Sequence, residues 1–244
     1  MMQRYFVEKF DENGFIIDKD DQHHIKKVMR MHDGDQIICI DNNQRVFLCE
    51  IKDIETGEIK VIEKLDTNCE LPVEVNLIYA LPKSDKFEFV LQKACELGVT
   101  RVIPLMSKRS IIKTNRETFS KKYPRFQKIL KEAAEQSYRN RIPEIEPLIK
   151  LSEVKDYLGN YNIVAYEENA KQNEMSNLKQ VLSQVENGDT ITIIVGCEGG
   201  FEQSEIDELE KIGVTSCSLG KRILRSETAP LYLLSAIGYA LELK

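Results

Sequence analysis

The 244-residue sequence predicts an α/β fold with an open, mostly parallel sheet, preceded by a smaller all-β domain. Nearly continuous apolar runs recur after residue 72, as in the strands of a buried parallel sheet. Amphipathic helical patterns separate these runs. Earlier in the chain, short alternating runs are interrupted by glycine or Asn/Asp clusters. We therefore divide the chain into residues 1–70 and residues 71–244.

Residues 1–70 predict a small β-barrel or sandwich with one short helix. Its strand patterns are "QRYFVEKF", "GDQIICIDN", "QRVFLCEIKDI" and "GEIKVIEKL". Between the first two, "DDQHHIKKVMRM" predicts a helix that turns Ile25, Val28 and Met29 inward. Lys26 and Arg30 would then lie on its exposed side.

Residues 71–244 predict alternating strands and helices. The strand patterns are "VEVNLIYAL", "TRVIPLMS", "NIVAYEE", "TITIIVG" and "VTSCSLG". The helical patterns cover residues 85–98, 120–138, 175–184, 203–212 and 227–243. In open parallel sheets, ligands bind beyond the carboxyl ends of the strands. "VGCEGGF" and "SLGKRILRSET" each follow a strand, so we expect both at that edge.

Composition excludes several classes of protein. No apolar run reaches the roughly 18–20 residues that a membrane span needs. The N-terminal stretch is charged throughout and has no apolar signal region, which predicts a cytoplasmic protein without a membrane partner. Six cysteines are scattered singly and the three histidines form no ligand-like spacing. The sequence therefore predicts reduced thiols and no metal site.

The distribution of charge is uneven. The net charge is −6, yet residues 101–141 hold 12 Lys or Arg and only 3 Asp or Glu. Such a basic block is typical of a surface that neutralises nucleic-acid phosphates. The alternative is a solvated, lysine-rich helix with no partner.

The stretch "VGCEGGF" connects the strand pattern "TITII" to the helical pattern "EQSEIDELEKIG". Glycine lacks a Cβ and tolerates positive φ, so a ligand can approach such a turn closely. A tight strand-to-helix connection would need the same residues. The turn alone leaves both interpretations open.

Five colinear motifs resemble one family, and together they cover nearly the whole chain. They are "HHIKKVMRMHDGD", "ELGVTRVIPLMSKRSIIK", "KILKEAAEQSYRNRIPEI", "IIVGCEGGFEQSEID" and "LGKRILRSETAPLYLLSAIGYAL". They resemble the ribosomal RNA small subunit methyltransferase E family, a group of SPOUT-class RNA methyltransferases. One departure is Cys197, which stands where the family commonly has proline.

The resemblance implies a fold and an activity. Residues 1–70 would form a PUA-like, RNA-binding β-barrel, and residues 71–244 a SPOUT methyltransferase domain with a C-terminal trefoil knot. The implied reaction is the S-adenosylmethionine-dependent methylation of N3 of one uridine in 16S ribosomal RNA, within the small ribosomal subunit. The family also forms homodimers, and the final helix "APLYLLSAIGYALEL" is apolar around most of its circumference, which favours burial on two sides.

On this interpretation, main-chain groups at two loops hold the adenine edge of S-adenosylmethionine. The predicted cofactor-binding residues form three walls: Val195, Gly196, Gly199 and Gly200; Leu219, Gly220, Ile223 and Leu224; and Tyr166 with Glu167. The alternative for the apolar residues Leu219, Ile223 and Leu224 is that they belong in part to the core.

Two residues are catalytic candidates. N3 of uridine carries a proton, so methylation needs a group that stabilises the developing negative charge on the base. We expect Arg225 to do this through the uracil carbonyl oxygens or the phosphate. Glu198 is either a proton acceptor or a carboxylate that fixes its loop, and Arg225 could instead pair with Glu198 and stiffen both loops.

The predicted RNA contacts come from three basic segments, which would hold the backbone while the target base is flipped out. They are Lys108, Arg109 and Lys113; Arg139 and Arg141; and Lys26 with Arg30. Two other functions remain open at this point. One is a non-catalytic RNA-binding or ribosome-assembly module. The other is a nucleotide-binding oxidoreductase, although "LIYALPKSDKFE" has no GxGxxG.

Overall fold

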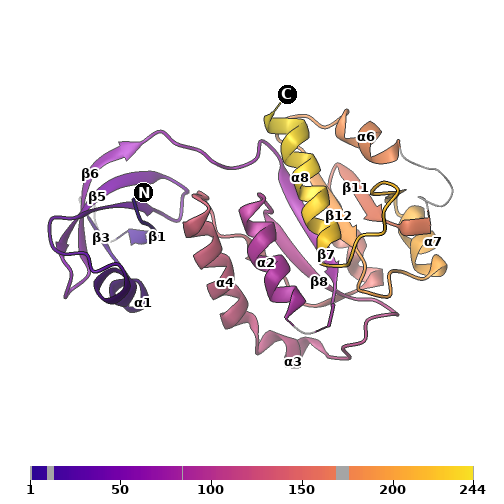
Figure 1. Ribbon diagram of the computed structural model, residues 1–244, viewed down its shortest axis with the longest axis horizontal. Coiled ribbons are helices and arrows are strands. Elements are labelled where there is room, and N and C mark those ends of the chain that lie inside the picture. The colour runs from indigo at the N-terminus through magenta and orange to yellow at the C-terminus, as the bar shows by residue number, and fades with distance from the viewer. Residues whose placement is uncertain (1, 10–13, 84, 169–175, 244) are drawn as a thin grey trace. The chain divides into compact units, whose positions relative to one another are not determined.

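The computed structural model describes residues 2–9, 14–83, 85–168 and 176–243. The chain forms two compact units (Figure 1). The first comprises Met1–Glu70 with Ala134–Ile142, and the second comprises Leu71–Ala133 with Pro143–Lys244. The division predicted at residue 70 assigned residues 134–142 to the second domain. In the structure this segment packs with the first unit.

The first unit contains a six-stranded sheet in the order β1-β4-β5-β6-β3-β2. β1 pairs with β4 in parallel, and the other pairings are antiparallel. Its strands are β1 (Arg4–Phe6), β2 (Glu8–Lys9), β3 (Gly14–Ile16), β4 (Gln36–Ile40), β5 (Val46–Asp53) and β6 (Glu58–Leu65). Alternate side chains such as Tyr5, Ile37 and Ile51 fill its core. Among the described strands, β1 and β2 are the two edge strands of this order. The predicted closure of the sheet into a barrel therefore stays a prediction.

One short helix covers this sheet, α1 (Lys19–His23), and it runs directly into a π-helical turn, η1 (His24–Val28). Ile25 is buried, as predicted, but Val28 is 60% exposed and Met29 is 36% exposed. The prediction of a regular helix with all three facing inward was therefore wrong. A π-helical turn has more residues per turn than an α-helix, so the expected 3.6-residue spacing fails there.

The second unit contains a seven-stranded sheet in the order β10-β8-β7-β12-β11-β13, with β9 also paired to β8. All of its pairings are parallel. The strands are β7 (Glu74–Ala80), β8 (Arg101–Met106), β9 (Glu144–Ile145), β10 (Ile149–Lys150), β11 (Tyr161–Ala165), β12 (Thr190–Val195) and β13 (Thr215–Cys217). The predicted mostly parallel sheet is confirmed. β9 and β10 were not predicted, because two residues are too few to show a period.

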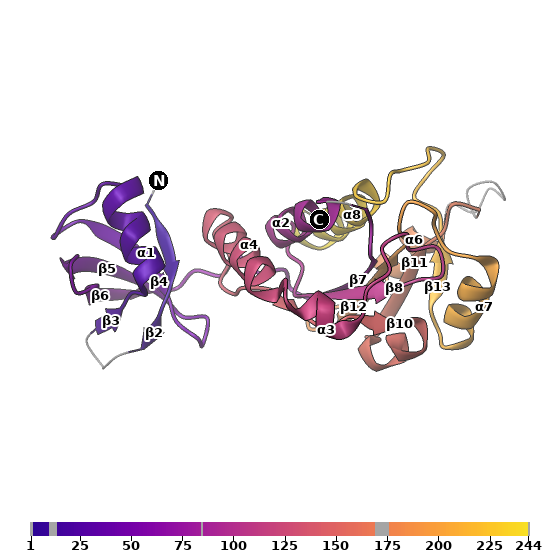
Figure 2. The same ribbon diagram turned by 90° about the horizontal axis from the view of Figure 1, so that it is seen from below.

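Helices cover both faces of this sheet. They are α2 (Lys86–Glu96), α3 (Arg116–Ser120), α4 (Tyr123–Gln136), the 3₁₀ helix η2 (Leu151–Tyr157), α6 (Asn177–Leu182), α7 (Gln203–Lys211) and α8 (Thr228–Glu242). Tyr79 stacks on Phe87 of α2, whereas Ile78, next to it on β7, packs with Ile206 of α7. Figure 2 shows α2 and α8 along one face. The helix predicted over residues 120–138 corresponds to α4, and the short helix α3 before it was not predicted.

The parallel pairing decides where a site can form. β7, β12, β11 and β13 are neighbours in the sheet and point in the same direction. The segments that follow them therefore emerge at one edge. These segments begin at Leu81, Gly196, Tyr166 and Ser218, and they include both glycine-containing loops singled out from the sequence.

Candidate functional site

A cavity of about 420 Å³ lies at the carboxyl edge of the second unit's sheet. This volume falls within the range of about 300–1,000 Å³ that is usual for small-molecule sites. The segments after β11, β12 and β13 line it, together with Lys86 of α2 and the start of α8. Its lining residues are Lys86, Ala165, Tyr166, Glu167, Val195, Gly196, Cys197, Glu198, Gly200, Leu219, Gly220, Arg222, Ile223, Leu224, Arg225, Ser226 and Ala229.

The first wall is the turn after β12. The Gly200 amide donates to the carbonyl of Cys197 at 2.9 Å, and Gly200 has φ +65°. A Cβ on Gly196 would lie 3.0 Å from the Cα of Gly200, so the two glycines allow the backbone to fold closely on itself. The turn in "VGCEGGF" is therefore tight, and it also lines a cavity. Cys197 is buried there, with its sulfur 3.8 Å from Ser107 Oγ.

The second wall is the loop after β13. Ser218 holds it, because its hydroxyl accepts from the Gly220 amide at 3.0 Å. Gly220 has φ +97° and open space where a Cβ would point. Ile223 is 77% exposed, so the interpretation of Ile223 as a core residue is wrong. Leu219 and Leu224 are half-buried.

The third side follows β11. The Tyr166 hydroxyl donates to Gln203 Oε1 at 3.0 Å, which ties this segment to the start of α7. The Glu167 carboxylate approaches the turn, since a Cβ on Gly200 would lie 3.5 Å from its Oε2. Gly199 is the one predicted cofactor residue that does not line the cavity. Its carbonyl accepts from Arg109 Nη1 at 2.9 Å instead.

Glu198 is held by groups from the segment after β7. Its carboxylate accepts from the Lys83 amide at 3.1 Å and lies 3.1 Å from Lys86 Nζ. Burial acts to raise the pKa of Glu198, but backbone amides and Lys86 outweigh this effect and lower it. A carboxylate with a lowered pKa is a weak proton acceptor. The geometry thus favours Glu198 as the group that fixes its loop.

Arg225 lines the cavity with an exposed side chain. Within the described part of the chain, its guanidinium makes no hydrogen bond or ion pair. The alternative pairing of Arg225 with Glu198 is therefore not formed, and Lys86 takes that place. Glu167 and Arg222 likewise lack such partners among the described residues, so the cavity holds charges of both signs that are open to a ligand.

Six lining residues were not predicted, and two of them, Lys86 and Arg222, are charged. Arg222 lies in the stretch "SLGKRILRSET", between the predicted residues Gly220 and Ile223. Lys86 follows β7, whose carboxyl end meets the same edge as β12. Because ligands bind at that edge, the position of Lys86 after β7 is a signal in the sequence for its place at the cavity.

The basic segment after β8 lies along the glycine turn. The Lys108 amide donates to Glu205 Oε1 at 2.9 Å, and Lys108 Nζ donates to Ser204 Oγ at 2.8 Å. Arg109 bonds the Gly199 carbonyl, as described above. The structure thus brings Lys108, Arg109 and the exposed Lys113 together beside the cavity-lining turn.

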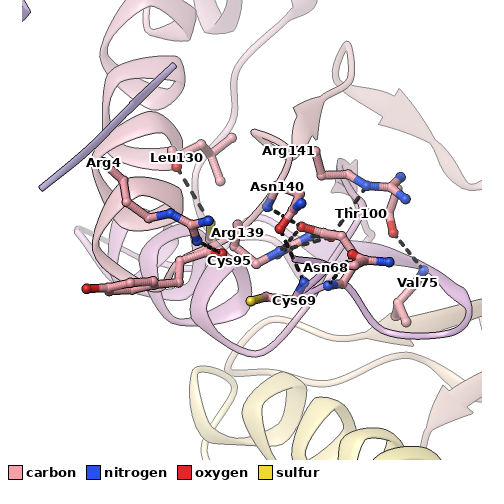
Figure 3. Close-up of polar contacts among 12 residues, drawn as sticks. Arg4, Asn68, Cys69, Val75, Cys95, Thr100, Leu130, Arg139, Asn140 and Arg141 are labelled. Carbon is pink, nitrogen blue, oxygen red and sulfur yellow. Dashed lines mark hydrogen bonds and ion pairs between the residues drawn. The ribbon is translucent and has the colours of Figure 1, made fainter. Parts of the chain in front are cut away.

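Arg139 corrects a prediction. Its side chain is 2% exposed and its guanidinium contacts Glu70, with Nε 2.9 Å from Oε1 and Nη2 2.5 Å from Oε2 (Figure 3). The backbone N–H of Asn140 donates to Glu70 Oε1 at 2.8 Å, and Arg141 Nε lies 3.4 Å from Glu70 Oε2. Arg139 is therefore a structural residue and not an RNA contact. Arg141 keeps 26% of its side chain exposed.

Next to this pair, Tyr138 adopts φ +64°, and Arg4 donates to its carbonyl while lying 4.7 Å over its ring. Of the two predicted RNA contacts in the first unit, Lys26 pairs with Glu55. Arg30 is exposed.

No helix among the described residues is long and apolar enough to cross a membrane. Nor does that part of the chain gather three His, Cys, Asp or Glu residues in a way that would hold a metal.

Comparison with known families defines the class of protein. A family model described as an RNA methyltransferase domain matches residues 69–238, and one described as an RNA methyltransferase PUA domain matches residues 17–64. The cavity thus belongs to a methyltransferase domain, and the first unit carries a PUA domain. The oxidoreductase interpretation is set aside.

Whole-chain relatives give the particular family. Ribosomal RNA small subunit methyltransferase E of Bacillus subtilis (strain 168) is 42% identical over 252 residues, covering 99% of this chain and 98% of the relative. Its namesake in Mesomycoplasma hyopneumoniae (strain 232) is 36% identical, covering 96% and 98%. The chain belongs to the ribosomal RNA small subunit methyltransferase E family, which confirms the resemblance found in its motifs.

Solved structures agree with this assignment. A crystal structure of ribosomal RNA small subunit methyltransferase E from Neisseria gonorrhoeae, bound to S-adenosyl methionine, has a TM-score of 0.83 and 27% identity over 98% of this chain and 97% of that chain. A putative methyltransferase from Legionella pneumophila, in complex with the same cofactor, has a TM-score of 0.86 and 26% identity over 98% of both chains.

Proposed function

We propose that this protein methylates N3 of a specific uridine in 16S ribosomal RNA, with S-adenosylmethionine as the methyl donor and the small ribosomal subunit as the substrate. Family membership and the two cofactor-bound relatives support the donor and the class of RNA. The observation that carries the proposal is Arg225, an exposed cation with no ion-pair partner among the described residues, on the wall of the cavity.

The residues present fit the proposed cofactor. The cavity combines a backbone-lined turn at Gly196 and Gly200 with apolar cover from Ile223 and Leu224. The turn and the loop after β13 offer main-chain groups for an adenine edge. Glu167 and Arg222 supply charges that complement a sulfonium and a carboxylate. Bound there, S-adenosylmethionine would supply an activated methyl group.

The chain's own residues then have two tasks at the acceptor. The reaction forms one N–C bond at N3, breaks one methyl–sulfur bond and releases the N3 proton. Negative charge therefore develops on the uracil, and Arg225 stabilises it through a preorganised guanidinium. Glu198, whose pKa is lowered, fixes the turn and leaves the proton to water. Positioning of the two reactants supplies most of the rate.

The remaining parts of the proposal concern the RNA and the assembly. Lys108, Arg109 and Lys113 contact the RNA backbone beside the cavity, and Lys26 and Arg30 contact it from the PUA unit. The target base is flipped out to reach the cavity. The enzyme works in the cytoplasm as a homodimer, and its methyltransferase domain contains the trefoil knot of the SPOUT class.

Two measurements test this proposal. Calorimetric titration with S-adenosylmethionine should show one site per chain. Incubation with cofactor and unmethylated small subunits should then produce a modification that arrests primer extension at one uridine, because N3 lies on the Watson–Crick edge. Methyl incorporation at another atom or another base would contradict the N3 assignment. The absence of incorporation into any ribosomal RNA would contradict the proposed activity.

A further inference from the structure

Lys86, the first residue of α2, lies between two carboxylates that belong to different loops of the cavity. Its Nζ is 3.1 Å from Oε1 of Glu198 and 3.0 Å from Oε2 of Glu227. Glu198 is part of the glycine turn after β12, and Glu227 directly follows the loop after β13. One ammonium group therefore joins the two loops that form the first and second walls.

The end of β7 extends this contact on both sides. The Lys83 amide donates to Glu198, with its nitrogen 3.1 Å and 3.3 Å from the two carboxylate oxygens. On the other side, Tyr79 donates to Ser226 Oγ at 3.4 Å, and Ser226 donates to Glu227 at 3.3 Å. Both loops are thus attached to the same strand end, with Lys86 at the centre of the chain of contacts.

The arrangement is poorly suited to stabilising the fold. The side chains of Lys86, Glu198 and Glu227 are 33%, 27% and 16% exposed. Ion pairs with this access to solvent contribute little to folding. Lys86 instead affects the local geometry of the two loops, because both carboxylates lie within hydrogen-bond distance of its nitrogen. Without that ammonium, two like charges would remain close together and would drive the loops apart.

We propose that Lys86 is a positioning residue that holds the glycine turn and the loop after β13 at the separation the cofactor requires. This inference rests on the proposed function, since it takes the ligand to be S-adenosylmethionine. Hydrogen bonds from Lys86 to Glu227 and then Glu198 raise the pKa of Lys86. Burial opposes the effect at both carboxylates, yet the pKa of each is lowered. All three groups are therefore charged near neutral pH.

The test compares Lys86→Met with Lys86→Arg and with a matched control. Lys86→Met should raise the dissociation constant for S-adenosylmethionine, measured by calorimetry, about 10-fold, as expected for the loss of directly coupled groups. The methylation rate at saturating cofactor should change much less. Lys86→Arg should recover most of the affinity, because a guanidinium fork can contact two carboxylates at once.

Lys93→Met is the control. Lys93 lies on the same helix with a similar side-chain exposure of 36%, and it pairs with Glu96 at 2.8 Å. Neither Lys93 nor Glu96 lines the cavity, so cofactor affinity should stay at the wild-type value. A second variant, Glu227→Gln, removes one of the two carboxylates without removing Lys86. Its effect should not add fully to that of Lys86→Met, because both break the same connection.

The outcomes separate this inference from the function on which it rests. If the wild-type protein binds no S-adenosylmethionine, the proposed function fails, and the inference fails with it. If the wild type binds but Lys86→Met binds equally well, only the inference is overturned. Equal losses in Lys86→Met and Lys86→Arg would also overturn it, and so would full additivity with Glu227→Gln.

Discussion

At the scale of single residues, Gly200 combines a positive φ of +65° with a place on the cavity wall. Gly200→Val should weaken S-adenosylmethionine binding at least about 10-fold and cost about 1–3 kcal/mol of stability, because a β-branched residue resists this conformation. Titration calorimetry and thermal unfolding measure the two effects. Gly188→Val is the control: its φ is +90° with open space around it, away from the cavity. It should share the strain but keep the affinity.

Arg225 is the residue on which the chemical step depends in our proposal. Removing one preorganised donor to a developing anion costs about 10²–10³ in rate. Arg225→Ala should therefore lower the single-turnover methylation rate by that factor at saturating cofactor, with little change in cofactor affinity. Lys221→Ala removes an exposed cation from the same loop, outside the cavity lining, and should leave the rate unchanged. A near wild-type rate in Arg225→Ala would remove Arg225 from the chemical step.

At the scale of elements, the Glu70–Arg139 pair joins the segment that follows β6 to residues 134–142 within the first unit. Burial acts to raise the pKa of Glu70, but hydrogen bonds from Arg139 and the Asn140 amide outweigh it, so the folded-state pKa lies below the ordinary 4.5. A lowered folded-state pKa stabilises the protein above pH 4.5, and this contribution disappears as the pH falls through the lowered value.

The prediction is that Glu70→Gln lowers the free energy of unfolding at pH 7 by about 3 kcal/mol, because it removes the carboxylate charge that contacts the buried Arg139 guanidinium. As the pH falls from 4.5 through the lowered folded-state pKa, the difference between the variant and the wild type should shrink, since Glu70 becomes protonated first in the unfolded and then in the folded chain. Urea unfolding across this pH range measures both effects. Glu63→Gln, an exposed change on β6, should show neither. If the loss of unfolding free energy does not depend on pH, it comes from the changed shape of the side chain at position 70 and not from its charge.

At the scale of the whole molecule, α8 has two apolar faces. Leu233, Leu234 and Ile237 are fully buried, whereas Tyr239 is 72% exposed and Tyr232 is 40% exposed. A helix that is apolar on both sides favours a second partner surface, so we predict a homodimer. Light scattering at micromolar concentration should give twice the chain mass for the wild type. For Tyr239→Glu it should give the mass of a single chain. Ile212→Glu, at an exposed apolar position directly after α7, should leave the dimer intact. A monomeric wild type would contradict the prediction.

Much of the sheet was predictable, because β7, β8 and β12 are apolar runs long enough to show their type. The glycine turn was also found, since Gly196 and Gly200 are needed for local geometry that sequence reveals. Side-chain pairing was not. Arg139 was placed in a basic surface, because its partner Glu70 is 69 positions away and a count of charges carries no information about burial. Lys86 was missed for the same reason: its carboxylate partners lie on distant segments.

The assignment of residues 134–142 to the first unit also bears on the order of synthesis. A ribosome releases residues 1–70 first, but Glu70 has no Arg139 to meet until about twice that length of chain has emerged. By then β7, β8 and both α2 and α4 have already been made. The first unit is therefore completed only after the first two strands of the methyltransferase domain have been made, and before either loop that lines the cavity exists.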